Sequence, residues 1–294
     1  MDKRIFMKSL LGAAVPLVVP ASAPVLAQGL PAPQVLRLAA NPNLSAIELL
    51  NNFGPFAREL EAELGVPVRL VAGRDYEDTL RLLRAGQVDI AGTGAFGYVS
   101  AHDSFGARLL VRYVEDDGDS YHAIIFVRKD SGITSLPQLR GKRFAFTDVK
   151  STSGYLLPVL ELARQGVQLA DLGKVEHVKK QPNAAIAVYN RLSDAGAMAD
   201  NQLTEKYSVK IDELRILWSS PPIPHGVWIA RPDMSDAELA RTSQAILRIS
   251  RSPQGRKALA AASVRGFAEA RDSDFEAVRA AARQFEKLGV GKRP

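Results

Sequence analysis

The chain reads VLRLAA at residues 35–40, VPVRLV at 66–71 and VDIA at 88–91, three short apolar runs of the kind that form β-strands. Two stretches with apolar residues at helical spacing separate these runs, and each stretch stops at a glycine. Asp75 stands where it can cap the second stretch. Strands that alternate with helices pair in parallel through right-handed crossovers. Residues 35–91 therefore predict an α/β fold whose sheet is covered by helices on both faces.

The same alternation continues through the second half of the chain, although the two halves share no detectable sequence repeat. Strands are expected at 123–127, 143–146, 175–178, 195–199, 214–218 and 227–230. Helices are expected at 154–165, 184–192, 235–262 and 274–288. Two α/β units with a helical tail predict two lobes with mixed, mainly parallel sheets, joined by a hinge. We expect lobe 1 to comprise residues 28–118 plus 222–294, and lobe 2 to comprise residues 119–221.

The first 27 residues differ in character from the rest of the chain. Three cations precede an apolar run, and the small residues Val25 and Ala27 stand at the third and first positions before a possible cleavage site. The run is interrupted by prolines and is too short to form a stable bilayer anchor. Residues 1–27 are therefore predicted to be a signal peptide cleaved near Ala27-Gln28, which places the mature protein in the periplasm. The alternative is an amphipathic leader on a cytoplasmic protein.

Composition limits the classes of protein to which the chain can belong. Of its 294 residues, 46% are hydrophobic and 24% are charged, which is typical of a soluble globular protein. Cysteine is absent, so disulfides, thiol nucleophiles, thiolate metal sites and a lipid anchor on cysteine are excluded. The net charge of +6 falls to +4 without residues 1–27, which suits an anionic solute. No long basic run indicates nucleic-acid binding, and the mature protein is not expected to be embedded in a membrane.

The sharpest local signal is DVKSTSGY at residues 148–155, between a predicted strand that ends at Phe146 and a predicted helix. Three hydroxyls, of Ser151, Thr152 and Ser153, stand at the helix N-terminus, where free N–H groups and the helix dipole favour an anion. Hydrogen bonds to a charged group contribute about 1.5–3 kcal/mol each. About four of them suffice for the roughly 8 kcal/mol of a micromolar complex. The alternative is that Ser151 or Ser153 is an ordinary N-cap.

Further side chains are candidates for the same cleft. Tyr76 begins a helix that follows a strand, and Tyr121 lies at a suspected crossover between the lobes. Each of these tyrosines is otherwise a half-buried core aromatic. Thr93 and Gly94 belong to a glycine-rich strand-to-helix turn at 92–98, which lets backbone amides approach a ligand but lacks the spacing of a nucleotide-binding motif.

Catalysis and metal binding find little support in the sequence. The four histidines are far apart and show no metal-binding spacing, and the G-x-S-x-G elbow of many hydrolases does not occur. The acidic run at 115–119 resembles part of a calcium loop but lacks the bidentate glutamate, so we interpret it as a solvated turn. We expect no metal, no cofactor and no enzymatic activity. A periplasmic hydrolase or transferase is the alternative.

Several motifs together resemble a known family. They are DY at 75–76, LRAGQVDIA at 83–91, VRKDSGI at 127–133, STSGYLLP at 151–158 and WSSPPIP at 218–224. In combination they are similar to the phosphate/phosphite/phosphonate periplasmic binding proteins of ABC transporters, over essentially the whole mature chain. The specific part is S-T-S-G-Y-x-x-P after G-K-x-F-A-F, because the other motifs would be weak in isolation.

The resemblance implies a type II periplasmic-binding-protein fold with a cleft that closes on its ligand. It implies that the ligand's oxygens are held by Ser151, Thr152, Ser153 and Tyr76. Where the phosphonate binders have a histidine, this chain has Gln181, which can still donate a hydrogen bond. Of the two acids that hold an aminoalkyl group in those proteins, one aligns near Asp200 or Asn201, and the other falls at 224–226, where no carboxylate stands. Pro158 should kink the helix that contains it.

The expected function is that of a periplasmic receptor that captures a phosphonate, or a related tetrahedral oxyanion such as phosphate or phosphite, for an ABC importer. The expected partner is an ABC permease, and we expect the receptor to be a monomer. The residues expected to bind the ligand are Ser151, Thr152, Ser153, Tyr76, Tyr121, Gln181, Thr93, Gly94 and Asp200. The alternative is a periplasmic ligand-sensing protein of the same fold that signals to a membrane histidine kinase.

Overall fold

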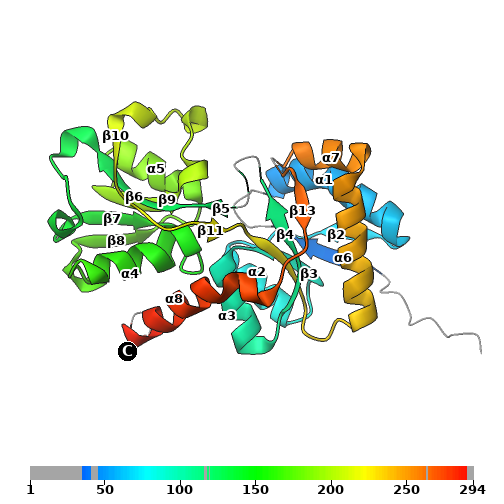
Figure 1. Ribbon diagram of the computed structural model, residues 1–294. Helices are drawn as coiled ribbons and strands as arrows, with labels where there is room; N and C mark the ends of the chain where they lie inside the picture. The colour runs from blue at the N-terminus through cyan, green and yellow to red at the C-terminus, as the bar shows by residue number, and fades with distance from the viewer. Residues whose placement is uncertain (1–34, 41–45, 116–117, 119, 263, 290–294) are drawn as a thin grey trace, which may run out of the picture. The chain divides into compact units, whose positions relative to one another are not determined.

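The computed structural model describes residues 35–40, 46–115, 118, 120–262 and 264–289. The predicted signal peptide, residues 1–27, lies outside the described residues. In the described part of the chain, every helix is too short or too polar to span a bilayer. Two β-sheets packed against helices dominate the structure, as predicted from the alternation of elements (Figure 1).

The first sheet has six strands in the order β13-β4-β12-β3-β1-β2. The strands are β1 (Leu36–Ala39), β2 (Val68–Leu70), β3 (Ile90–Thr93), β4 (Arg108–Val114), β12 (Val227–Ala230) and β13 (Gly266–Ala268). β1 pairs in parallel with β2 and β3, whereas the pairs that involve β4, β12 and β13 are antiparallel. In this sheet, parallel pairing is therefore limited to the three strands of the stretch 35–91.

Helices cover both faces of this sheet. α1 (Ala46–Leu64), α6 (Asp236–Arg251) and α7 (Pro253–Ala260) pack on one face, and α2 (Tyr76–Arg84) and α3 (Ala95–Phe105) pack on the other. Trp228 in β12 is fully buried and meets Phe56 of α1 edge to face, with ring centroids 5.1 Å apart. The ring of Phe267 in β13 completes this aromatic core, with its centroid 4.8 Å from that of Trp228. Such clusters bury a large apolar area and are a main source of stability.

The second sheet has five strands in the order β10-β6-β9-β7-β8. The strands are β6 (Ala123–Arg128), β7 (Arg143–Phe146), β8 (Lys174–His177), β9 (Ala195–Ala199) and β10 (Leu214–Ser219). β7 pairs in parallel with β8 and β9, and β6 pairs antiparallel with β9 and β10. Its helices include α4 (Leu157–Arg164) and α5 (Gln181–Tyr189). Both sheets are thus mixed, and in each of them three neighbouring strands are paired in parallel.

Both sheets contain the same arginine–aspartate contact. Arg37 in β1 donates from its backbone N–H and its guanidinium to the carboxylate of Asp89, which precedes β3, over 2.8–3.0 Å. Arg143 in β7 makes the same three bonds to Asp194, which precedes β9, over 2.8–3.2 Å. Each aspartate N–H donates in return to the carbonyl of its arginine. The two sheets are therefore built alike, although their sequences show no repeat.

Two short segments join the sheets. β5 (Ser120–Tyr121) and β11 (Ile223–Pro224) pair antiparallel on the stretches of chain that run between β4 and β6 and between β10 and β12 (Figure 1). Both stretches carry the chain from one sheet to the other. A two-residue pair of this kind leaves few backbone hydrogen bonds to resist rotation, which suits a hinge.

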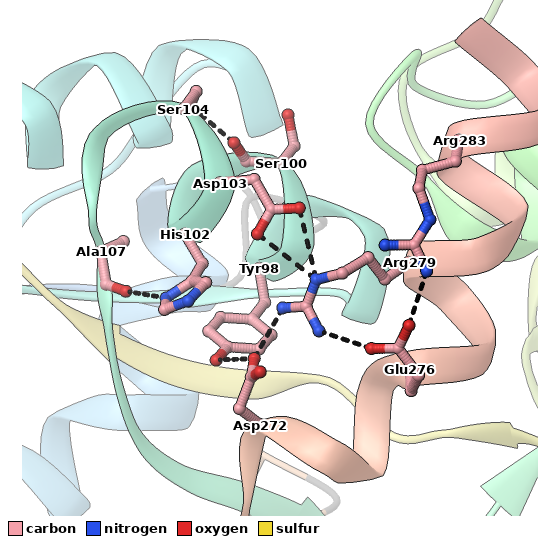
Figure 2. Close-up of polar contacts among 10 residues, drawn as sticks. All are labelled: Tyr98, Ser100, His102, Asp103, Ser104, Ala107, Asp272, Glu276, Arg279 and Arg283. Atoms are coloured by element: carbon pink, nitrogen blue, oxygen red, sulfur yellow. Dashed lines mark hydrogen bonds and ion pairs between the residues drawn. The ribbon is translucent and has the colours of Figure 1, made fainter. Parts of the chain in front are cut away.

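The last helix, α8 (Glu276–Lys287), contacts α3, which packs on the first sheet, and α4, which belongs to the second sheet's helices. The guanidinium of its Arg279 donates to the carboxylate of Asp272 over 2.6 Å and to that of Asp103 in α3 over 3.3 Å (Figure 2). These bonds fix α8 to the first sheet's helices. Near its other end, Phe285 lies against Tyr155, with ring centroids 5.5 Å apart. α8 therefore connects the first sheet's helices with the helix that contains Tyr155.

The structure differs from the sequence prediction in the C-terminal part of the chain. The single helix expected at 235–262 is two helices, because Ser252 ends α6 and caps α7 by accepting the N–H of Gly255 at 2.9 Å. Pro253 then begins α7, a position at which its missing N–H costs nothing. The strands β4 and β13 were not predicted, because they are defined by antiparallel partners and have no periodicity of their own. The glycine-rich strand-to-helix turn at 92–98 leads into α3, for which no helix range was predicted.

Candidate functional site

The hydroxyl-rich stretch forms an unusual helix start. A π-helical turn spans Thr152–Leu156 and is closed by a bond from the N–H of Leu156 to the carbonyl of Ser151 over 3.0 Å, after which α4 begins. Pro158 has no N–H, so the carbonyl of Gly154 lacks its usual helical donor. That carbonyl accepts the N–H of Thr147 instead, over 3.1 Å. The distortion predicted at Pro158 thus takes the form of a π turn, which ties the helix start to the end of β7.

Gly154 lies too close to the end of β7 for any side chain. A Cβ at this position would be 1.7 Å from the Oγ1 of Thr147 and 2.7 Å from its Cβ. The close approach is what lets Thr147 reach the carbonyl of Gly154. The glycine of the S-T-S-G-Y motif is therefore required by packing.

The three hydroxyls are buried but keep protons to donate. Ser151, Thr152 and Ser153 are exposed by 4%, 2% and 1%. The Oγ of Ser151 accepts the N–H of Gly154 over 3.0 Å, so Ser151 is an N-cap, and the Oγ1 of Thr152 accepts the N–H of Phe96 over 2.9 Å. A hydroxyl that accepts an N–H still has its own O–H to donate. The capping and anion-binding interpretations of this stretch are therefore compatible.

A small cavity of about 70 Å³ lies beside this helix start. Five of the residues expected at the site line it, namely Tyr76, Gly94, Tyr121, Ser153 and Gln181. Burial raises the pKa of the Tyr121 phenol to about 12, against the lowering effect of its hydrogen bond with Ser153. The phenol therefore stays protonated at neutral pH and remains a donor. The cavity is much smaller than the several hundred Å³ of pockets for drug-sized ligands.

Gln181 is held in one orientation by the backbone. Its Oε1 accepts the N–H of Ala199 over 2.9 Å, and because an N–H can only donate, the amide oxygen must point to Ala199. The Nε2 then faces the Oγ atoms of Ser151 and Ser153, at 3.3 and 3.4 Å. Gln181 thus presents an N–H donor on the same side as the serine hydroxyls.

Four of the expected site residues do not line the cavity, namely Ser151, Thr152, Thr93 and Asp200. Ser151 and Thr152 precede Ser153 in the helix start. Thr93 is buried in β3, where its Oγ1 lies against Gly97. The carboxylate of Asp200 accepts the backbone N–H groups of His122 and Asn201, over 2.9 and 2.8 Å, so it stabilises a turn. Asn201, the alternative to Asp200 in the sequence comparison with phosphonate binders, lines the cavity.

Glu115 and His225 line the cavity and were not among the expected site residues. The carboxylate of Glu115 accepts a hydrogen bond from Asn201 over 3.1 Å and lies 3.7 Å from the Nδ1 of His225. The ring of His225 stacks on that of Tyr121, with centroids 5.4 Å apart. The sequence placed Glu115 in a solvated acidic turn, and no local signal distinguishes it from its acidic neighbours. A carboxylate is thus present at the site, although residue 225 does not supply it.

The hydrogen-bond donors that face the cavity include hydroxyl, phenol and amide groups, which carry no formal charge. Among the described residues that line the cavity there is no lysine or arginine. Hydroxyl, amide and phenol groups, together with the N-terminus of the helix that begins at Thr152, supply the positive potential. The part of the chain that the structure describes contains no cluster of metal-ligating side chains. The arrangement can bind a small anion by hydrogen bonds.

Comparison with known proteins shows extensive similarity. The family model of phosphonate periplasmic substrate-binding proteins of ABC transporters matches residues 38–275. The Phosphonates-binding periplasmic protein of Escherichia coli strain K12 is 28% identical over 245 residues, which cover 80% of this chain and 72% of that protein. The Phosphate-import protein PhnD of Mycolicibacterium smegmatis is 30% identical over 214 residues, which cover 67% of this chain and 66% of that protein.

A solved structure supports the fold. PhnD1 from Prochlorococcus marinus, in complex with methylphosphonate, has a TM-score of 0.76 at 21% identity, covering 86% of this chain and 99% of that chain. At this identity the likeness shows the fold alone. It confirms the predicted two-lobed α/β fold of type II periplasmic binding proteins.

Proposed function

The chain belongs to the family of phosphonate periplasmic substrate-binding proteins of ABC transporters, and we propose that it captures a small phosphorus oxyanion in the cavity beside Ser153 for delivery to an ABC permease. The observation that carries the proposal is the convergence of hydroxyl, phenol and amide donors from both sheets' helices and connections on one cavity of about 70 Å³. Four hydrogen bonds to a charged ligand supply roughly the 8 kcal/mol of a micromolar complex.

The proposed location follows from the same family membership. We propose that residues 1–27 are a signal peptide removed near Ala27-Gln28, and that the mature receptor is a periplasmic monomer. The proposed lobe 1 is 28–118 plus 222–294 and the proposed lobe 2 is 119–221. The membership of strands in the two sheets supports this division, because β1 to β4, β12 and β13 form one sheet and β6 to β10 form the other.

The ligand is tested first by thermal shift of residues 28–294. The panel contains phosphate, phosphite, methylphosphonate, 2-aminoethylphosphonate, sulfate and arsenate. A ligand present at a hundred times its dissociation constant stabilises the folded state by roughly 2.7 kcal/mol. A shift by one or more phosphorus oxyanions is expected. If none of the compounds shifts the melting temperature, the oxyanion assignment is wrong.

Ser153→Ala is expected to weaken binding of the best phosphorus oxyanion by at least about tenfold, because one hydrogen bond to a charged group contributes about 1.5–3 kcal/mol. Ser151→Ala should weaken binding to a similar degree and should also lower stability by about 1 kcal/mol, because it removes an N-cap. The measurement is isothermal titration, with thermal unfolding of the unliganded variants. The site assignment fails if both variants keep the original affinity.

Ser252→Ala is the matched control for Ser151→Ala. Both serines cap a helix by accepting the N–H of a glycine three residues later, over 3.0 Å for Ser151 and 2.9 Å for Ser252. Ser252 lies at the start of α7, which does not line the cavity. We expect the two variants to lose similar stability, and only Ser151→Ala to lose affinity.

Glu115 is expected to influence which oxyanion binds. An ionised carboxylate can only accept hydrogen bonds, so it favours a ligand that carries a P–OH or an ammonium group over fully deprotonated sulfate. Glu115→Gln should therefore reduce the preference for hydrogen phosphate over sulfate by about tenfold, a difference of about 1.4 kcal/mol. Titration of both anions into each variant measures the ratio. An equal gain in affinity for both anions would mean that Glu115 acts only by long-range repulsion.

A further inference from the structure

Lys179 does not line the cavity, but it lies between two carboxylates, those of Asp75 and Asp148, whose neighbours in the chain belong to the site. It follows β8 and comes two residues before Gln181, which does line the cavity. Its ammonium is 3.3 Å from the carboxylate of Asp75, at the start of α2, and 3.9 Å from that of Asp148, after β7. One cation thus contacts a carboxylate at the start of a helix of the first sheet and a carboxylate that follows a strand of the second sheet.

The two carboxylates adjoin the residues that would hold the ligand. Asp75 caps α2 with its Oδ1, which accepts the N–H of Asp78 over 2.9 Å, and directs Oδ2 to Lys179. The next residue is Tyr76, which lines the cavity. Asp148 precedes the hydroxyl-rich helix start by three residues, and the carbonyl of Asp148 accepts the N–H of Ser151 over 2.9 Å. Lys179 is therefore coupled to the Tyr76 side and to the Ser151 side of the cavity.

Asp148 depends on a nearby cation. Its carboxylate is fully buried, and its Oδ2 makes no hydrogen bond among the described residues. Burial and, to a smaller extent, the charge of Asp75 raise the pKa of Asp148, whereas the N–H of Lys150, the charge of Lys179 and the N–H of Tyr76 lower it. A buried carboxylate without a compensating charge is destabilising, so Asp148 favours the arrangement that keeps Lys179 close.

The backbone at Lys179 is strained. The N–H of Lys180 donates to the carbonyl of Val178 over 2.8 Å, which closes a three-residue turn around Lys179, whose φ is 69°. A γ-turn with positive φ at its centre is rare for a residue with a side chain, and such strain concentrates at functional positions. The turn directs the side chain of Lys179 to both carboxylates.

We propose that Lys179 is a positioning residue that bridges Asp75 and Asp148 and so holds the Tyr76 side of the cavity against the hydroxyl-rich helix start. The proposal rests on the proposed function, because it concerns the closed state of the same site. Lys179 does not touch the ligand. It slows release of the bound oxyanion by stabilising the closed arrangement of the lobes.

The test uses residues 28–294, with inorganic phosphate and methylphosphonate as probes, isothermal titration for affinity and stopped-flow displacement for the dissociation rate. Lys179→Gln keeps the turn and removes the charge, and we expect about a tenfold faster dissociation with little change in the association rate. Lys179→Arg keeps the charge and should stay within about threefold of the original rate. Lys174→Gln is the matched control, because Lys174 pairs with Glu176 in β8 and does not line the cavity.

A double-mutant cycle separates the bridge from a general charge effect. Asn is a good N-cap, so Asp75→Asn removes the charge at the cap of α2 and keeps its capping oxygen. In the Asp75→Asn background, Lys179→Gln should change the dissociation rate by less than about threefold. A full tenfold effect in that background, or an equal effect of Lys174→Gln, would overturn the bridge. If the unmodified protein binds neither probe, the proposed function fails instead.

Discussion

Gly154→Ala is expected to reduce affinity for the best phosphorus oxyanion by at least about a hundredfold and to lower stability by about 2–3 kcal/mol. The added Cβ would lie 1.7 Å from the Oγ1 of Thr147, so the helix start must move away from the end of β7. Overpacking of this kind costs about 1–3 kcal/mol. The movement also breaks the bond from Thr147 to the carbonyl of residue 154 and displaces the hydroxyls of Ser151 and Ser153. Displacement of several donors at once explains why the loss of affinity exceeds that of a single serine variant.

Gly54→Ala is the control for this substitution. Gly54 lies inside α1, and apart from its chain neighbours a Cβ there would meet only the end of the Arg58 side chain, at 3.8 Å. Alanine is the better helix former by up to about 1 kcal/mol, but its Cβ is crowded by the ring of Pro55, so Gly54→Ala should change stability by less than about 1 kcal/mol and leave affinity unchanged. Isothermal titration and thermal unfolding of both variants measure the contrast. Retention of full affinity by Gly154→Ala would show that the close approach at Thr147 does not position the site.

Asp89→Asn is expected to lower the free energy of unfolding by about 3 kcal/mol. The Asp89 carboxylate is 3% exposed and accepts bonds from Arg37 and from the Nε of Arg231, over 2.8–3.0 Å. An amide in its place has no negative charge and turns an NH₂ group toward the guanidinium groups. Arg37 then loses its carboxylate partner, whereas Arg231 keeps its ion pair with Asp233. Removing one partner of a buried ion pair costs about 3–5 kcal/mol, and the 36% exposure of the Arg37 side chain places the expected value at the lower end.

Asp194→Asn is the internal comparison for Asp89→Asn. Asp194 makes the same three bonds to Arg143, but its side chain is 31% exposed and that of Arg143 is 44% exposed. Exposed pairs contribute about 1 kcal/mol or less, so Asp194→Asn should cost about 1 kcal/mol. Chemical denaturation of the two variants measures both values. Equal losses would mean that burial does not determine the strength of this repeated contact.

The effect of Asp89→Asn should also depend on pH. Burial alone would raise the pKa of Asp89, but the hydrogen bonds from Arg37 outweigh it, so the pKa is lowered. A carboxyl with a lowered pKa in the folded state stabilises the protein above its unfolded pKa of about 3.9, and that contribution is lost as the pH falls through the folded value. The difference in stability between the original protein and Asp89→Asn should therefore narrow below about pH 4. A constant difference from pH 7 to pH 3 would contradict this assignment.

The secondary structure was predictable where short stretches of sequence decide it. The strands at 35–40, 88–91 and 143–146 are short apolar runs flanked by turn or helix signals, and the structure has strands there. The helix start at Ser151 was predictable because capping is a contact between near neighbours. The antiparallel strands β4 and β13 were not predictable, because they are defined by partners far away in the sequence.

The α/β class, the family resemblance and the hydroxyl-rich helix N-terminus could be predicted from the amino-acid sequence, because periodicity, capping and a local motif are properties of neighbouring residues. Which distant side chains meet at the cavity became known from the fold alone. Glu115 and His225 belong to the two segments that join the sheets, and Lys179 reaches a carboxylate on the other sheet's helix. Their contacts depend on strand order and on how the chain crosses between the sheets, and these long-range pairings leave no pattern in a single stretch of sequence.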